Sequence, residues 1–270
     1  MIEERRHDDV LELRGSSRVS RAMGFAVHAY LVRGVLVDTL FPALGGDVAA
    51  WLAARRPAGA LLTHHHEDHA GNISVLASRG LPAGMASTTL ARVRRPAPVG
   101  YYRRLCWGVP AALAADPAPF AADGLELIPA PGHSTDHHVV WDRETGTVFG
   151  GDLFLGVKVR IAHPGEDVRG QPAVLRRIAA LGPVRFFDAH RGLVPDPVAA
   201  LRAKADWIEE IADRIARRAA DGWAASAITR DVLGRGDLTG LVSRGDYAKR
   251  NLVDALLATR VAPTNGPGGQ

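Results

Sequence analysis

The chain of 270 residues contains very little cysteine and no long apolar run. Cys106 is the only cysteine, which excludes an intrachain disulfide and a metal site built from several thiolates. Its neighbours supply no base that would activate a thiol, so we predict a small buried residue there rather than a nucleophile. No apolar run is long enough to cross a bilayer, and the charged first nine residues lead into no segment typical of a signal peptide. We therefore expect no membrane association and a cytoplasmic location.

Lysine is also scarce, since only three of the 33 basic residues are lysines. The net charge of +4 and the pI near 9.6 would permit a nucleic-acid partner. However, the basic residues are mostly scattered singly or in pairs, and we interpret clusters such as 92–95 and 103–104 as solvated surface. A small-molecule substrate is therefore the favoured partner and nucleic acid is the less favoured one. Nothing in the pattern indicates an oligomeric state.

The pattern of apolar residues changes near residue 195. Before it, short or alternating apolar runs predict strands at residues 10–13, 25–32, 35–37, 60–62, 125–128, 138–141, 147–149 and 184–187. Helices are expected between them at 47–55, 71–78 and 173–181, and the proline-interrupted stretch 96–119 is interpreted as a loop or lid. After residue 195, apolar residues recur every three or four positions, which predicts a long helix followed by shorter ones near 224–233 and 247–258. We predict an α+β catalytic domain over 1–195, a helical extension over 196–260 and a disordered tail over 261–270.

The most informative stretch follows the strand expected at residues 60–62. Within six residues it contains four potential metal ligands, His64, His66, Asp68 and His69. Alternate side chains of an extended or tightly turned segment project to one side, and imidazole and carboxylate groups suit zinc and related divalent ions. Four such groups at one strand end predict a metal site. The intervening His65 and Glu67 are expected to point away from it.

This H-x-H-x-D-H pattern resembles the signature of the metallo-β-lactamase fold superfamily. Members of that superfamily also have an early aspartate after a strand, a histidine in a Gly-His-Ser/Thr turn, a bridging aspartate at a strand end and a last histidine after a later strand. Counterparts of these landmarks occur here in the same order, namely Asp38, His133, Asp152 and His190. The resemblance extends from Asp38 to His190 and implies an αββα sandwich.

The resemblance also implies two metal ions. One would be bound by His64, His66 and His133, the other by Asp68, His69 and His190, with Asp152 shared between them. Zinc is the expected metal, although the same ligand types accept iron or manganese. Paired metals can hold one hydroxide between them, because a bound water ionises near neutral pH. Asp68 and Asp152 are the catalytic candidates, as ligands of the ions that bind this water.

Two further residues are predicted to support the site. Asp38 is interpreted as an acceptor that orients a ligand histidine; the alternative is an aspartate that caps a turn at a strand end. His137 belongs to a Gly-His-Ser-Thr-Asp-His stretch similar to a common motif of the superfamily, in which the second histidine is structural. We favour a buried, hydrogen-bonded role for His137 over that of a catalytic proton donor.

The presence of Asp152 narrows the expected activity. Zinc β-lactamases of this fold lack a bridging aspartate at that landmark, whereas thioesterases similar to glyoxalase II, lactonases, phosphodiesterases and processing ribonucleases have one. The helical extension is similar to that of β-lactamase-like proteins related to glyoxalase II, and the stretch 221–247 also permits a winged-helix-like module. Our first hypothesis is hydrolysis of a small ester, thioester or lactone, with Arg160 or Arg191 available to a glutathione-type substrate. A ribonuclease or phosphodiesterase, a non-catalytic binding protein and an iron-dependent oxidative enzyme are the alternatives.

Overall fold

The computed structural model describes residues 1–258, and the first of its two sheets is built from the N-terminal part of the chain. Its six strands lie in chain order: β1 (Ile2–His7), β2 (Val10–Gly15), β3 (Val27–Val32), β4 (Val35–Val37), β5 (Gly59–Leu61) and β6 (Ala83–Gly84). The first four strands are antiparallel, and β4, β5 and β6 are parallel. Arg33 and Gly34 join β3 to β4, and both have positive φ, as a type I′ hairpin turn of two residues requires.

The second sheet contains five strands in the order β11-β10-β9-β8-β7. Their bounds are β7 (Leu125–Pro129), β8 (His138–Asp142), β9 (Thr147–Phe149), β10 (Arg185–Asp188) and β11 (Gly192–Val194). Only β9 and β10 are parallel to each other, and the helix expected between them is present as α6 (Gln171–Ala180). α6 therefore provides the crossover connection between the parallel strands β9 and β10, and the neighbouring strands β8 and β11 pair with them in antiparallel fashion.

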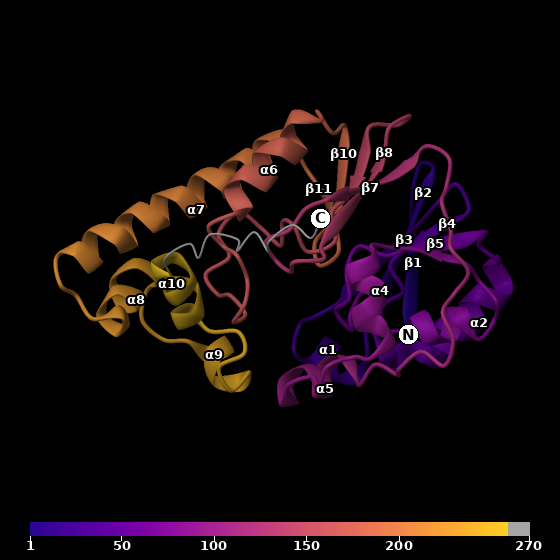
Figure 1. Cartoon of the computed structure of the whole chain (residues 1–270), viewed down its shortest axis with the longest axis horizontal. Coiled ribbons are helices and arrows are strands. Elements are labelled where there is room, and N and C mark those ends of the chain that lie inside the picture. The colour runs from indigo at the N-terminus through magenta and orange to yellow at the C-terminus, as the bar shows by residue number, and fades with distance from the viewer. Residues whose placement is uncertain (259–270) are drawn as a thin grey trace, which may run out of the picture.

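The two sheets pack face to face through buried aromatic and branched side chains. The ring of Tyr30 lies 5.3 Å from that of Phe149 and 5.0 Å from that of Phe187, and its hydroxyl donates to the carbonyl of Asp188 at 2.7 Å. Helices cover the outer faces: α1 (Arg18–Ala22), α2 (Gly45–Arg55), α3 (Ile73–Ala77), α4 (Ser87–Arg94) and α5 (Tyr101–Trp107) beside the first sheet, and α6 and α7 (Pro197–Ala220) beside the second. Figure 1 shows these two halves against each other. The αββα sandwich expected from the resemblance is confirmed.

The C-terminal region is helical. α7 runs for 24 residues along α6, with the predicted apolar stripe buried, and is followed by α8 (Ala225–Leu233), α9 (Leu238–Val242) and α10 (Lys249–Leu257), as Figure 1 shows. No strand forms between residues 196 and 258, so the hairpin of a winged helix is missing from this stretch. The predicted tail 261–270 lies outside the described residues, and the domain division at residue 195 stays a prediction. No helix within residues 1–258 is both long and apolar enough to span a membrane.

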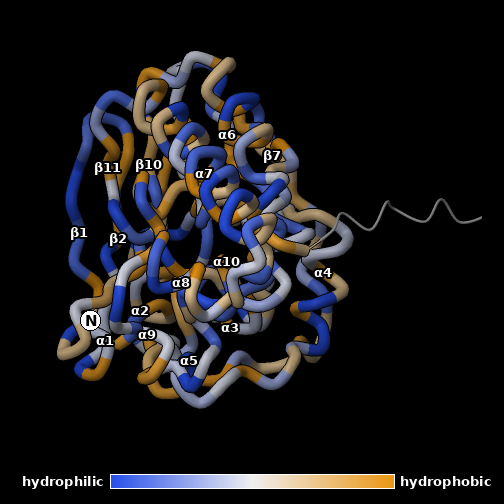
Figure 2. Tube along the Cα trace, turned by 90° about the vertical axis from the view of Figure 1, so that its left-hand side faces the viewer, coloured by the Kyte–Doolittle hydropathy of each residue, from blue (hydrophilic) through white to orange (hydrophobic). Residues whose placement is uncertain are grey.

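Several elements were not predicted from the sequence, among them β1 and α5. β1 is hydrophilic along most of its length and forms an outer edge of the first sheet, as Figure 2 shows, so it has no apolar pattern to reveal it. α5 lies inside the proline-rich stretch interpreted as a loop, where it buries Tyr102, Cys106 and Trp107. The burial of Cys106 confirms the prediction for that residue.

Gly150, the first residue after β9, lies against the core without space for a larger side chain. A Cβ atom at Gly150 would overlap the fully buried ring of Phe186. We expect Gly150→Ala to lower the free energy of unfolding by about 1–3 kcal/mol, as overpacking of cores does. At Gly46, in α2, a Cβ would meet nothing within 4 Å, and Gly46→Ala should raise stability by about 0.5–1 kcal/mol. Urea unfolding of both variants checks the pair; equal effects would contradict the packing argument.

Candidate metal centre

Side chains that are far apart in the sequence meet at one edge of the two sheets. The segment His64–His69 follows β5, Asp152 follows β9 and His190 follows β10, while His133 lies in the loop between β7 and β8. β5 is parallel to β4, and β9 is parallel to β10. Because parallel strands end at the same edge of a sheet, short turns after them are enough to bring polar side chains together. All seven metal ligands proposed from the sequence are brought together here.

Four of these residues form a first group. Nε2 of His64 lies 3.0 Å from Nδ1 of His66, and Nε2 of His133 lies 2.9 Å from the same Nδ1 atom. Oδ2 of Asp152 is 3.2 Å from Nε2 of His133. One donor atom from each of the four residues lies within 4.8 Å of all the others, which matches an ion bound at about 2.0–2.2 Å from each ligand.

A second group contains Asp68, His69, His190 and again Asp152. Oδ1 of Asp152 lies 3.2 Å from Nε2 of His69 and 3.2 Å from Nε2 of His190, whose Nε2 is 3.4 Å from Oδ2 of Asp68. Asp152 thus presents one carboxylate oxygen to each group. A single carboxylate shared in this way is the arrangement expected of a bridging ligand.

The donor atoms in these groups fit divalent cations. Within residues 1–258, Nε2 of His69 and Oδ1 of Asp152 are buried without a hydrogen-bond partner, and buried polar atoms are otherwise almost always satisfied. Burial holds the pKa of both His64 and His66 well below its ordinary value, so that both rings are neutral and offer lone pairs. Imidazoles and carboxylates without a thiolate suit zinc, iron or manganese. Metal identity stays a prediction.

Asp38 lies behind the second group. Its Oδ2 accepts a hydrogen bond from Nδ1 of His69 at 2.9 Å and another from the Thr63 hydroxyl at 2.8 Å. That hydroxyl in turn accepts from Nδ1 of His64 at 3.0 Å. Both rings are thereby held with Nε2 toward the groups described above. This network supports the orienting role predicted for Asp38 over the capping of a local turn.

Comparison with known proteins identifies the family. A model of the metallo-beta-lactamase superfamily matches residues 22–206, more than half of the chain. The chain belongs to this superfamily. The matched segment contains every residue of the two groups, and it ends inside α7, so that α8–α10 lie beyond it.

Individual relatives are distant. The chain is 29% identical over 144 residues to the beta-lactamase-like protein 2 homolog of Drosophila melanogaster, covering 51% of this chain and 46% of that protein. It is 31% identical over 167 residues to the hydroxyacylglutathione hydrolase of Halorhodospira halophila, covering 57% and 56%. The chain therefore spans about half the length of the curated relatives that it matches.

Solved structures share the fold. A metallo-beta-lactamase family protein from Thermus thermophilus superposes with a TM-score of 0.64 at 19% identity, covering 93% of this chain and 91% of that one. The mono-zinc form of the metallo-beta-lactamase FIM-1 from Pseudomonas aeruginosa gives 0.58 at 17% identity, covering 77% and 95%. At these identities the likeness concerns the fold alone.

His137 is buried beside the metal groups and uses both ring nitrogens. Its Nε2 accepts from the backbone N–H of Asp152 at 3.1 Å, and its Nδ1 donates to the carbonyl of Ala130 at 3.1 Å. Burial lowers the pKa of His137 to about 3, so the ring is neutral. A ring with both nitrogens engaged in this way orients the Asp152 backbone, which supports the structural role that we favoured over a proton donor.

One expectation for this region was wrong. Glu67 turns away from the metal groups as predicted, but Arg103, which we interpreted as solvated surface, is largely buried against it. Nε of Arg103 donates to Oε1 of Glu67 at 2.6 Å, and a second guanidinium nitrogen donates to Oε2. The guanidinium links α5 to the turn that carries Asp68. A pair of adjacent arginines does not reveal which of the two faces inward, and here the helix turns only one of them toward the core.

A cavity of about 750 Å³ opens beside the metal groups. Asp68, Asp152, His133 and His190 form one part of its lining, and α5, the loop 155–161, α7 and the segment 236–252 form much of the rest. Much of this wall is apolar or aromatic, including Trp107, Val157, Trp207, Ile208 and Leu252. The volume is within the range of ligand-binding pockets. The stretch 96–119 thus does border the site, through α5.

Five lysine or arginine side chains line this cavity; apart from the buried Lys204, we call them the basic wall: Lys158, Arg160, Arg191 and Lys249. The loop that carries the first two is fixed from both sides. Nε of Arg191 donates to the carbonyl of Leu155, and the backbone of Ala162 pairs with that of Ala248. Within the described residues, none of the four forms an ion pair with a carboxylate. The basic wall therefore places four cations with no direct carboxylate partner among residues 1–258 in a cavity that Asp68, Asp152, Glu166 and Asp237 also line.

Lys204, on α7, is a residue that the sequence argument missed. It is buried and lines the same cavity, and its Nζ donates to the carbonyls of Leu153 and Phe154 at 2.9 and 2.7 Å. Burial lowers its pKa to about 8. Because these carbonyls directly follow Asp152, Lys204 fixes the turn that carries the shared carboxylate. A lysine on an amphipathic helix has no local signal that distinguishes it from surface charge.

Proposed function

We propose that this protein is a metal-dependent hydrolase that cleaves a small ester, thioester or lactone at the two His/Asp groups. One observation carries the proposal: two donor sets that share Asp152 line a cavity large enough for a small organic substrate. Two divalent cations in these sets would acidify water and polarise the substrate carbonyl. Zinc is the metal that we propose.

The residues of the chain supply the remaining requirements. The three histidines of the first group and the two of the second would hold the cations, and Asp68 and Asp152 would add the negative charge that divalent ions require. The backbone N–H of Asp152 is held by His137, and the turn after it by Lys204. The apolar wall excludes water from the bound substrate, which strengthens the electrostatic interactions at the reacting carbonyl.

The basic wall favours substrates with an anionic part. Four cations without carboxylate partners in the described part of the chain would attract a carboxylate or phosphate next to an apolar acyl or leaving group. A thioester of glutathione, which carries carboxylates, meets this description, as does a small acid-bearing ester. The relative from Halorhodospira halophila named hydroxyacylglutathione hydrolase is consistent with this substrate class.

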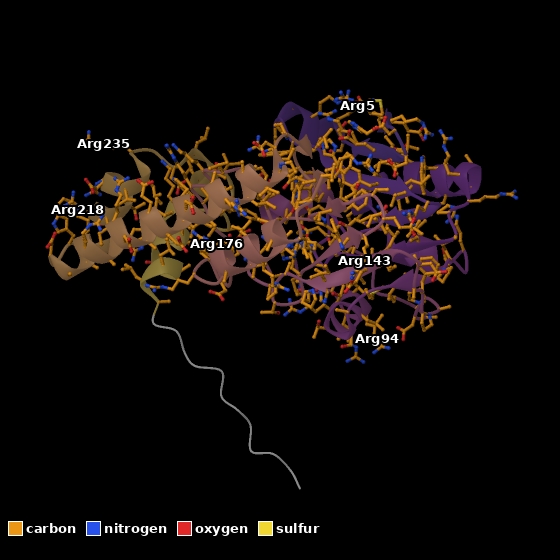
Figure 3. All side chains as sticks on the ribbon, turned by 90° about the horizontal axis from the view of Figure 1, so that it is seen from above. Arg5, Arg94, Arg143, Arg176, Arg218 and Arg235 are labelled. Atoms are coloured by element: carbon orange, nitrogen blue, oxygen red, sulfur yellow. The ribbon has the colours of Figure 1, made fainter. Side chains whose placement is uncertain are left out.

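Two matched charge variants test the role of the basic wall. We expect Lys158→Ala to raise KM for an S-acyl glutathione about tenfold, equivalent to about 1.4 kcal/mol, and to leave KM for a neutral aryl ester unchanged. Arg5→Ala is the control, because it also removes one positive charge, from an exposed arginine of β1 that does not line the cavity (labelled in Figure 3). Steady-state kinetics on both substrates measure the difference. An equal effect on the charged and neutral substrates would contradict the role.

A substrate panel on metal-quantified protein tests the proposed function. The panel contains S-acyl glutathiones, lactones and aryl esters, together with bis-p-nitrophenyl phosphate and single-stranded RNA, each with and without a chelator. We expect chelator-sensitive turnover of the acyl substrates. Turnover of the phosphodiester and RNA alone would favour the nuclease alternative, and no turnover of any substrate by protein containing two metal ions would favour a non-catalytic role.

A further inference from the structure

One nitrogen of the candidate ligand His133 lacks the support that the corresponding atoms of other ligand histidines have. Nε2 of His133 faces the first metal group, whereas its Nδ1 is buried without a hydrogen-bond partner among residues 1–258. The outward nitrogens of three other ligand histidines do have acceptors: His64 donates to Thr63, His69 to Asp38, and His190 to the carbonyl of Ala26 at 3.2 Å. A buried N–H that faces no acceptor is costly, so the surroundings of this atom are informative.

The carboxylate of Glu166 lies next to this nitrogen. Its Oε1 is 3.6 Å from Nδ1 of His133, and the side chain is only 12% exposed. The same oxygen accepts the backbone N–H of His163 at 3.0 Å, and Oε2 lies 3.5 Å from the side-chain nitrogen of Gln171, which donates to it. Two contacts close to it in the sequence therefore hold the carboxylate in place beside the histidine.

The loop that carries Glu166 is also joined to the turn that carries His133. The backbone N–H of Asp167 donates to the carbonyl of Gly132 at 2.8 Å. Since both backbones are linked, a shift of a few tenths of an ångström along the 3.6 Å separation would form a hydrogen bond.

We propose that Glu166 is a positioning residue for the metal centre, which accepts a hydrogen bond from Nδ1 of His133 and thereby orients that ring toward the ion of the first group. The inference rests on the proposed function, because it requires a cation between His64, His66 and His133. Glu166 corresponds to Asp38 at the other group, where the carboxylate already accepts from Nδ1 of His69 at 2.9 Å. Each group would then have its own carboxylate behind one ligand histidine.

The experiment measures two successive zinc-binding constants by competition with a chelating dye, on the full chain stripped of metal and refilled. We expect the wild type to bind two ions tightly. Glu166→Ala should weaken one of the two constants about 10- to 100-fold, the usual effect of losing such a partner. Glu166→Gln keeps an oxygen acceptor without the charge, so its zinc affinity should fall less than that of Glu166→Ala. Activity of both variants should return toward the wild-type value when zinc is added in excess.

Two further variants establish which group is affected. Asp167→Asn removes the charge of the neighbouring residue. The side chain of Asp167 accepts a hydrogen bond from the backbone N–H of Gly170, so the substitution should leave both zinc-binding constants unchanged. Asp38→Asn should weaken mainly the constant of the second group, through His69, with a smaller effect on the first group through Thr63 and His64, and the double variant with Glu166→Ala should weaken both constants strongly. These results would support the assignment of one carboxylate to each group.

Contrary results are distinct. If the Glu166 variants bind both ions with wild-type constants, or lose both equally together with thermal stability, Glu166 does not orient His133 and the inference fails while the proposed function stands. If the wild type itself binds no zinc, iron or manganese, the proposed function fails and the inference fails with it. Should Glu166→Ala not fold, the same reading is made on Glu166→Gln.

Discussion

Asp152→Asn is expected to lower kcat/KM for the best acyl substrate about a thousandfold or more, which corresponds to about 4 kcal/mol of lost transition-state stabilisation. The asparagine keeps the shape of the side chain but removes the one carboxylate whose two oxygens face both groups, at 3.2 Å from His133, His69 and His190. Both metal-binding constants should fall together, in contrast to the single constant expected for the Glu166 variants.

The control for this variant is Asp221→Asn, an exposed aspartate at the end of α7 that should change neither activity nor metal content. Thermal unfolding of both variants separates a loss of chemistry from a loss of fold. Asp152→Asn protein that binds two ions and retains wild-type turnover would show that this carboxylate is not shared between the ions.

Removal of the metal is expected to abolish activity and to lower the melting temperature by about 10 °C. Ligands present at about a thousand times their dissociation constant stabilise the folded state by about 4 kcal/mol, and a protein of this size changes its melting temperature by about 2–4 °C per kcal/mol. The physical reason is local. Without a cation, Nε2 of His69 and Oδ1 of Asp152 are buried with no hydrogen-bond partner in residues 1–258, close to a second carboxylate at Asp68.

Differential scanning calorimetry before and after dialysis against a chelator measures this change in melting temperature. When zinc, iron or manganese is added back one at a time, the melting temperature and the activity should recover together. A dialysis against zinc-loaded chelator, which has no free capacity for zinc, controls for effects of the chelator itself. A melting temperature that does not change on metal loss, with activity intact, would rule out a structural and catalytic role for the ions.

A local pattern predicted the first metal-binding segment, and the family resemblance supplied the remaining ligands. His64, His66, Asp68 and His69 stand within six residues at a strand end, and the later histidines and aspartates each follow an apolar strand. That His133, Asp152 and His190 converge on this segment was implied by the resemblance to the metallo-β-lactamase superfamily, whose landmarks occur here in the same order. The long helix α7 was also predictable from a local pattern, since its apolar residues repeat with the helical period.

The surroundings of the site were not predictable in this way. Arg103, Lys204 and Glu166 come from a short helix, a long helix and a loop, and each acts through a contact with a residue 33 to 51 positions away. Burial of such a group depends on how the layers pack, and charged residues on helices have the same sequence pattern whether they face solvent or a cavity. The metal ligands were therefore visible in the sequence, whereas the residues that orient them and shape the cavity required the fold.

The claim that joins these results is that two cations lie between the seven His and Asp side chains. Crystals of the metal-loaded protein, measured on both sides of the zinc absorption edge, test it directly by anomalous scattering. We predict two peaks about 3.5–4 Å apart, one between His64, His66 and His133 and the other between Asp68, His69 and His190, with Asp152 between them. An anomalous map with no peak among these residues, from protein that is fully active, would contradict the account.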